Sequence, residues 1–181
     1  MPDPDDLTLV EPRLDQQDAY VDMAREFTRE GAQHGRWAVD EASFEGFVLE
    51  LRRQARADDL LSIRVPQTTY WLVRSDGVIV GTSRLRHRLT PELEIFGGHI
   101  GYDVRPSERR KGYGTRLLAL TLDKARALGL TYDMLTCDDD NVASYRVMER
   151  NGGRLPDRVS QPDTGRLARR YWFALDAGAA C

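Results

Sequence analysis

A short, basic, glycine-containing turn in the second half of the chain has the residue types needed to bind an anion. It runs from Arg109 to Gly114 and leads directly into the most regular helical pattern of the sequence. The first N–H groups of a helix have no partner within it and lie at the positive end of the helix dipole. Gly112 and Gly114 carry no Cβ, so a ligand can approach the backbone closely. The turn therefore predicts a site for an anion such as a pyrophosphate.

Two common nucleotide-binding motifs do not describe this turn. No Gly-Lys-Ser/Thr closes it, as a P-loop requires. A dinucleotide-binding fingerprint would have its third glycine at position 117, which is Leu117. The competing interpretation is an ordinary surface turn, with glycines for its geometry and basic residues for solubility. The turn alone favours an anion site without identifying the ligand.

A second segment follows after the length of one helix and one strand. It reads Asn141-x-x-Ser144-x-x-Val-Met148-Glu-Arg-x-Gly152. With the first segment, Arg109-x-x-Gly112-x-Gly114, it resembles the GNAT superfamily of N-acetyltransferases. That family has Arg/Gln-x-x-Gly-x-Gly/Ala before a helix and Asn-x-x-Ala-x-x-Leu-Tyr-Glu-Lys-x-Gly downstream. Both segments occur here in register, within a core of about residues 97–155.

The resemblance implies that the chain transfers an acetyl group from acetyl-CoA to a primary amine. Backbone amides from Arg110 to Thr115 would hold the pyrophosphate, and the pantetheine arm would pair with the strand end at Val104, as an added strand does. Asn141 would hydrogen-bond that arm, or serve only as a helix N-cap. The implied cofactor-binding residues are Val104, Arg109, Arg110, Lys111, Gly112, Tyr113, Gly114, Thr115, Asn141 and Ser144. We expect no metal.

Acetyl transfer to an amine also needs a base that removes a proton from the amine. We expect this base to be His99, at the start of the strand that leads to the turn, where similar sequences often have Glu. Its ordinary pKa of about 6.5 suits proton transfer near neutrality. The alternatives are Glu92, Glu94 and Asp103. Alternation along the strand should point the Asp103 side chain away from Val104. A histidine that only satisfies hydrogen bonds there is the competing interpretation.

The proton donor to the leaving thiolate is where this sequence departs from the family. The usual tyrosine falls on Met148, which cannot donate a proton. Tyr145 lies three residues earlier on the same helix face and is the candidate, although it could also pack in the core. The departure leaves open a non-catalytic protein that binds or senses acyl-CoA. Another acyl donor, such as succinyl-CoA, is also open.

The acceptor amine belongs to an unidentified small molecule or peptide. Its candidate contacts are Arg36, Trp37, Trp71, Arg84, Arg86, His87 and Arg88. Strand alternation places Arg84, Arg86 and Arg88 on one face, where they could meet an acidic acceptor or form a solvated sheet face.

Composition limits the partners. The net charge of -3 disfavours general nucleic-acid binding, which calls for a strongly basic domain. No apolar run approaches the length of a membrane span, and Met1 to Asp6 has no signal-peptide character. Cys137 and Cys181 lack metal-ligand or disulfide spacing, which fits a cytoplasmic location. We expect neither nucleic acid nor membrane as a partner, and the resemblance is compatible with a homodimer.

The surrounding pattern predicts one α/β domain over residues 1–181. Expected helices are 15–30, 43–56, 112–128 and 141–151, expected strands are 7–10, 69–74, 78–86, 99–104, 132–137 and 166–175, and 90–97 is expected to be a loop. The strand 99–104, the helix after it and the strand 132–137 form a βαβ unit, whose strands should be parallel. We therefore predict a mixed, mostly antiparallel sheet with a central parallel splay and helices on both faces.

Overall fold

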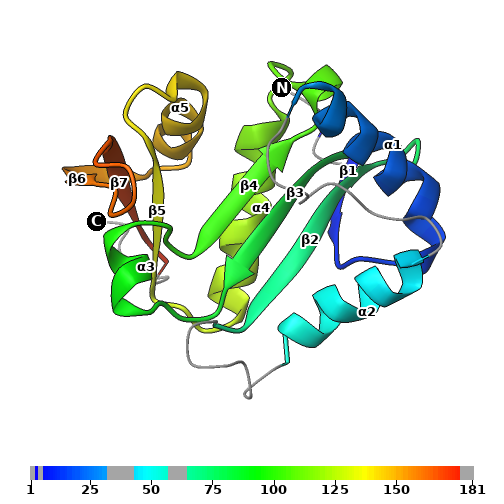
Figure 1. Ribbon diagram of the computed structural model, residues 1–181, viewed down its shortest axis with the longest axis horizontal. Coiled ribbons are helices and arrows are strands. Elements are labelled where there is room, and N and C mark those ends of the chain that lie inside the picture. The colour runs from blue at the N-terminus through cyan, green and yellow to red at the C-terminus, as the bar shows by residue number, and fades with distance from the viewer. Residues whose placement is uncertain (1–2, 4–5, 32–42, 57–64, 176–181) are drawn as a thin grey trace.

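A computed structural model describes residue 3 and residues 6–31, 43–56 and 65–175 of the chain. Within these residues the strands form two antiparallel sheets, and helices lie on both faces of the larger one (Figure 1). The expected fold class, α/β with mostly antiparallel strands between helices, is confirmed. The predicted contacts Arg36 and Trp37 lie outside the described residues, as does Cys181.

The larger sheet has the strand order β1-β2-β3-β4. Its members are β1 (Leu7–Val10), β2 (Gln67–Arg74), β3 (Ile79–Arg86) and β4 (Ile100–Val104). A turn at Asp76-Gly77 joins β2 to β3, with Gly77 at a φ of 86°. Among the described strands, β4 pairs with β3 alone, so it is an edge strand of the sheet.

Helices cover both faces of this sheet because successive strand residues point to opposite sides. Trp71 packs with Tyr20 and Phe44, whereas the next residue, Leu72, packs with Leu117. The first face is thus covered by α1 (Gln17–Arg29) and α2 (Phe44–Gln54), and the other by α4 (Tyr113–Ala127). A glycine in the left-handed region, Gly129 (φ 83°), follows the end of α4.

The smaller sheet has the order β5-β7-β6. It consists of β5 (Tyr132–Asp138), β6 (Arg154–Ser160) and β7 (Leu167–Ala174), and α5 (Val142–Arg150) connects β5 to β6. The sequence did not predict β6, because Pro156 interrupts its pattern. The structure accommodates this proline at a register shift between Arg154 and Asp157, on an edge strand where a missing N–H is tolerated.

The two sheets meet where β4 begins. Gly98 forms an isolated bridge with Leu135, and the His99 N–H donates to the Met134 carbonyl at 2.7 Å. A Cβ on Gly98 would lie 2.1 Å from that carbonyl oxygen, so only glycine fits this crossing. Beyond it, β4 and β5 separate toward α4 and α5 (Figure 1). The strands splay as expected, but no parallel ladder joins them in the described residues, so two antiparallel sheets replace one mixed sheet.

Two local predictions before β4 are corrected. His99 precedes the strand, which begins at Ile100. The expected loop 90–97 contains a short helix, α3 (Pro91–Ile95), capped by the Thr90 side chain, which accepts from the Leu93 N–H at 3.4 Å. Five residues are too few for a helical period to be visible in the sequence.

Two 3-10 turns, η2 (Leu14–Gln16) and η4 (Pro106–Glu108), complete the described elements. No helix in the described part of the chain has the length and apolar character needed to cross a bilayer.

Candidate functional site

The start of α4 presents a run of unused main-chain donors. Gly112 is the N-cap, with a φ of 94°, and Arg110 also has a positive φ, of 64°. Within the described residues, the N–H groups of 110–114 donate to no acceptor, whereas those of Thr115 and Arg116 donate back to the Gly112 carbonyl at 3.1 and 3.3 Å. Five consecutive donors at the positive end of a four-turn helix are suited to bind an anion, and the residues present fit a pyrophosphate.

The basic side chains of the turn contribute less free charge than the sequence suggests. The Arg109 guanidinium binds Glu30, with Nη2 at 2.7 Å from Oε2, and its Nε donates to the Val104 carbonyl at 3.2 Å. The Lys111 ammonium binds Glu108 at 2.9 Å. Arg110 is exposed and has no partner among the described residues. Positive potential at the turn therefore comes mainly from the helix end and from Arg110.

Arg116, in the first turn of α4, also has an unused donor. Its Nε is buried and has no acceptor within the described residues. A buried donor without a partner costs about 1–3 kcal/mol, which an anionic ligand would offset.

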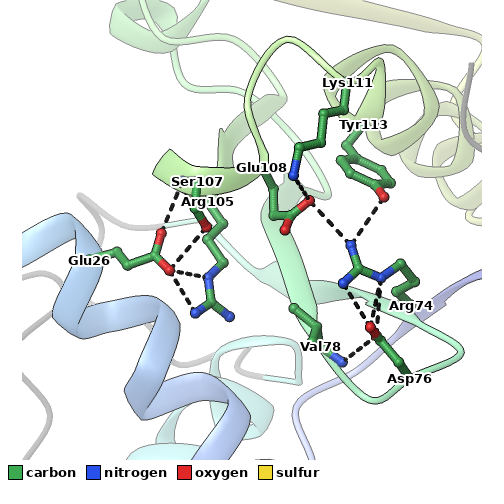
Figure 2. A network of polar contacts seen from close by, with 9 residues as sticks. All are labelled: Glu26, Arg74, Asp76, Val78, Arg105, Ser107, Glu108, Lys111 and Tyr113. Atoms are coloured by element: carbon green, nitrogen blue, oxygen red, sulfur yellow. Dashed lines mark hydrogen bonds and ion pairs between the residues drawn. The ribbon is translucent and has the colours of Figure 1, made fainter.

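Glu26 fixes the turn to α1 (Figure 2). Its carboxylate accepts from the Arg105 Nε at 2.7 Å and from the N–H and hydroxyl of Ser107 at 3.0 Å each. Burial alone would raise the pKa of Glu26, but these hydrogen bonds hold it below its ordinary value. The ionised carboxylate thus anchors both ends of the segment 105–107.

Arg74 fixes the same turn from the β2–β3 hairpin (Figure 2). Its Nη1 donates to the Glu108 carboxylate and to the Tyr113 hydroxyl, both at 3.2 Å. Its Nη2 binds Asp76 at 2.7 Å. One guanidinium therefore joins the hairpin, the 3-10 turn and the first residue of α4.

We expect Arg74→Met to raise the dissociation constant of acetyl-CoA several-fold and to lower the free energy of unfolding by about 1–3 kcal/mol. The reason is that buried Glu108 would keep only Lys111 as a partner, and the first residue of α4 would lose its anchor. Calorimetry and thermal melting measure the two effects. Arg126→Met is the matched control, since within the described part of the chain Arg126 forms only an exposed pair with Asp123 on α4. Unchanged acetyl-CoA affinity in Arg74→Met would contradict this role.

The open edge of β4 lies next to the run of donors. The Arg105 N–H donates to the Val80 carbonyl, and the His99 carbonyl accepts from the Arg86 N–H. Alternate residues of an antiparallel strand bond to the same neighbour, so the main-chain groups of Ile100, Tyr102 and Val104 face the edge without a strand partner. An extended chain could pair with this edge, as predicted for Val104.

The start of α5 faces β4 across the splay. The Asn141 side chain accepts from the Ser144 N–H at 3.0 Å, which confirms it as an N-cap. The Tyr102 hydroxyl lies 3.0 Å from the Ser144 hydroxyl, and burial raises the pKa of this phenol. Burial also raises the pKa of the Cys137 thiol, to about 11. These groups are neutral hydrogen-bonding groups at physiological pH.

The two residues proposed for catalysis have different environments. Tyr145 is half-buried under the Arg169 guanidinium, 4.0 Å from its ring centre, and its hydroxyl bonds to no described residue. His99 is 3% exposed, and its Nδ1 lies 3.2 Å from both the Met134 N–H nitrogen and Asp133 Oδ1. The structure thus places His99 inside the junction of the two sheets. Met148, at the family's tyrosine position, is a core residue.

Asp133 is fully buried beside His99, and burial raises the pKa of its carboxyl. Its two carboxyl oxygens have no hydrogen-bond partner in the described residues, so burial favours the neutral, protonated form. The folded chain then holds a proton that the unfolded chain releases above about pH 3.9. Stability is therefore lost as the pH rises from that value through the folded-state pKa.

We expect Asp133→Asn to raise the free energy of unfolding at pH 7 by about 1–3 kcal/mol, because the amide is neutral at every pH and needs no proton in order to be buried. The gain should disappear near pH 3.5, where the carboxyl is protonated in both states. Denaturant unfolding at the two pH values measures this difference. A loss of stability at pH 7 would instead indicate a charged Asp133–His99 pair.

Some of the residues expected to contact the acceptor amine line a pocket, and one has a structural role. Trp71 and Arg84 line one pocket on the face covered by α1 and α2. Arg84 lies 3.5 Å from Asp103, which faces away from Val104 as predicted. Arg86 is instead a structural residue, whose Nη1 donates to the Gly98 carbonyl at 2.6 Å.

The remaining two candidates lie apart from this pocket. His87 is bonded to Thr68 at 2.8 Å, and burial lowers its pKa. Arg88 is exposed. The expected row of three arginines therefore does not form a single open face.

Known proteins resemble this chain in sequence pattern and in fold. The sequence model of the Acetyltransferase (GNAT) family matches residues 23–153. No curated protein sequence matches the chain.

Solved structures share the fold at low identity. The acetyl-CoA complex of yncA, a putative acetyltransferase from Salmonella typhimurium, is 18% identical, with a TM-score of 0.62 over 97% of this chain and 99% of that one. Mycobacterium smegmatis RimJ with CoA-disulfide is also 18% identical, with a TM-score of 0.71 over 93% and 81%. Spermidine N-acetyltransferase from Vibrio cholerae, with CoA and spermine, is 12% identical, with a TM-score of 0.65 over 94% and 96%.

Proposed function

This chain belongs to the GNAT family of acetyltransferases, which use acetyl-CoA, and on that premise we propose that it acetylates a primary amine of a small molecule or peptide by direct attack. The observation that carries the proposal is the run of unused N–H groups at 110–114, beside the open edge of β4. A pocket on the α1 and α2 side of β2 and β3 supplies a place for the amine. Donor and acceptor would then meet at β4.

Named residues would hold acetyl-CoA in this arrangement. The N–H groups of 110–114 and the Arg110 side chain would bind the pyrophosphate, and the edge groups of Tyr102 and Val104 would pair with the pantetheine arm. Asn141 and Ser144 would contact that arm from α5. When bound, acetyl-CoA would supply an acyl carbon activated as a thioester. An edge N–H of β4 would stabilise the developing oxyanion.

The position of the pocket favours Asp103 as the base. Its carboxylate faces the same side of the sheet as Arg84, toward the space where an amine would enter. His99, the base expected from the sequence, is enclosed between the sheets, so it would act only through a proton path from the interior. We therefore assign proton removal to Asp103 and keep His99 as the alternative that substitution tests.

Tyr145 is the proposed proton donor to the leaving thiolate. Its hydroxyl has no partner in the described residues, and it extends from the helix that faces β4. A free thiol has a pKa of about 8.5, so this protonation is a modest demand. We also propose a cytoplasmic location, since the buried thiol of Cys137 is unpaired and fits a reducing compartment.

A turnover assay tests the proposal against the non-catalytic alternative. Purified protein is incubated with acetyl-CoA and a panel of primary amines, and released CoA is measured by thiol titration. Release above background with at least one amine, and a 42 Da gain of that amine by mass spectrometry (roughly the mass of an acetyl group replacing hydrogen), supports the enzyme. Tight CoA binding without turnover across the panel would support a sensing protein.

A further inference from the structure

The pocket on the α1 and α2 side has an apolar roof and a polar floor. The roof is formed by Tyr20, Phe47 and Leu51, the floor by Thr69, Trp71, Thr82 and Arg84, and the volume is about 90 Å³. Two rows of paired residues run across the sheet from the floor of the pocket to β4. Trp71 pairs with Thr82, which pairs with Asp103, and in the next row Arg84 lies between Thr69 and Gly101. An amine held over this floor would have its nitrogen near β4.

Two polar atoms of this floor are buried without a partner in the described residues. They are Thr69 Oγ1 and Trp71 Nε1, on residues that are 6% and 0% exposed. Each such atom costs about 1–3 kcal/mol. An indole N–H is only a donor, and a hydroxyl can donate. Both would be satisfied by one oxygen acceptor on a ligand, such as a carbonyl.

The charge of the pocket limits the ligand further. Arg84 is the only charged residue among the described residues that line it, and it lies beside Asp103. A second ammonium group on the acceptor would therefore be desolvated next to a guanidinium, with no carboxylate of its own. A single amine avoids this cost, and an apolar substituent matches the roof of Tyr20, Phe47 and Leu51.

From these observations we propose the chemical class of the acceptor. It is a monoamine with an apolar or aromatic group and a carbonyl oxygen close to the amine, as in the amide of an apolar amino acid or the first residue of a peptide. Thr69 and Trp71 are the residues that recognise the carbonyl. This inference rests on the proposed function, because it assigns the pocket to the acceptor of the same reaction.

The test compares two amines that differ in the carbonyl group. We expect Thr69→Val to lower kcat/KM for phenylalaninamide about 10-fold, as the loss of one buried hydrogen bond implies, and to leave 2-phenylethylamine within about twofold. The melting temperature should not fall, because the substitution removes an unpartnered hydroxyl. Trp71→Phe, which keeps an aromatic ring and removes the N–H, should show the same selectivity. An equal loss for both amines would overturn the assignment.

Two further measurements separate this inference from the proposed function. In calorimetry with CoA present, phenylalaninamide should bind wild-type protein more tightly than Thr69→Val. If it binds in this way but is never acetylated, the pocket assignment stands and the proposed function fails. If spermidine is acetylated with a higher kcat/KM than phenylalaninamide, the function stands and this inference fails. Phenylalaninamide preferred over a Phe-initiated tripeptide supports a small-molecule acceptor, and the reverse order supports a peptide.

Discussion

Replacing Gly112 with tryptophan should weaken acetyl-CoA binding by on the order of 100-fold or more, the loss expected from two charge-assisted hydrogen bonds. Gly112 has a φ of 94°, a conformation that side-chain-bearing residues rarely adopt. It also lies in the middle of the five unused N–H groups. An indole at this position would occupy the place proposed for the pyrophosphate and shift the donors around it. Isothermal calorimetry with CoA measures the effect.

Gly129→Trp is the matched control for this substitution. Gly129 has a similar φ of 83°, it follows the opposite end of α4, and a Cβ there would meet nothing within 4 Å. Both variants carry a comparable backbone strain of about 1–2 kcal/mol, but only one of them alters the donors. Normal CoA affinity in Gly112→Trp, or equal losses in the two variants, would mean that the diphosphate is held elsewhere.

Asp103→Asn should lower kcat by about 10²–10⁴-fold, the usual contribution of a general base, with little change in acetyl-CoA affinity. The amide keeps the size of the side chain and can still contact Arg84, but it cannot accept a proton from the amine. Steady-state kinetics with an accepted amine, together with CoA binding by calorimetry, separate the two quantities.

His99→Gln is the informative comparison for Asp103. His99 is buried at the junction of the sheets, so this substitution should lower the melting temperature but have little effect on kcat. If His99→Gln instead abolished turnover in a stably folded protein while Asp103→Asn remained active, His99 would be the base after all.

The part of the site that the sequence could predict is the part that depends on local geometry. A glycine before a regular helical pattern indicates a helix start with open donors, and the structure places Gly112 and α4 accordingly. Asn141 as an N-cap follows from the same local chemistry. The alternation that separates Asp103 from Val104 is equally local.

The contacts that could not be predicted are long-range. Arg109 and Lys111 look like ligands of an anion in the sequence, yet Glu30 and Glu108 neutralise them, and Glu30 is distant in the chain. The link from Arg74 to Tyr113 likewise depends on how the hairpin folds onto α4.

His99 illustrates the same limit for catalysis. The sequence places it near the site, and only the crossing of Gly98 with β5 shows that it is enclosed. There was also little indication in the sequence that Thr69 and Trp71 form the floor of a pocket, since alternating threonine and aromatic residues are ordinary in a strand. Their unpartnered polar atoms become visible only when the covering helices are in place.

A crystal structure of the protein with CoA tests the central claim most directly. We expect diphosphate oxygens at about 2.7–3.2 Å from main-chain nitrogens within 110–114, with the pantetheine arm beside the edge of β4. Diphosphate bound at another surface, with the nitrogens of 110–114 bonded to water or to the protein itself, would contradict the account.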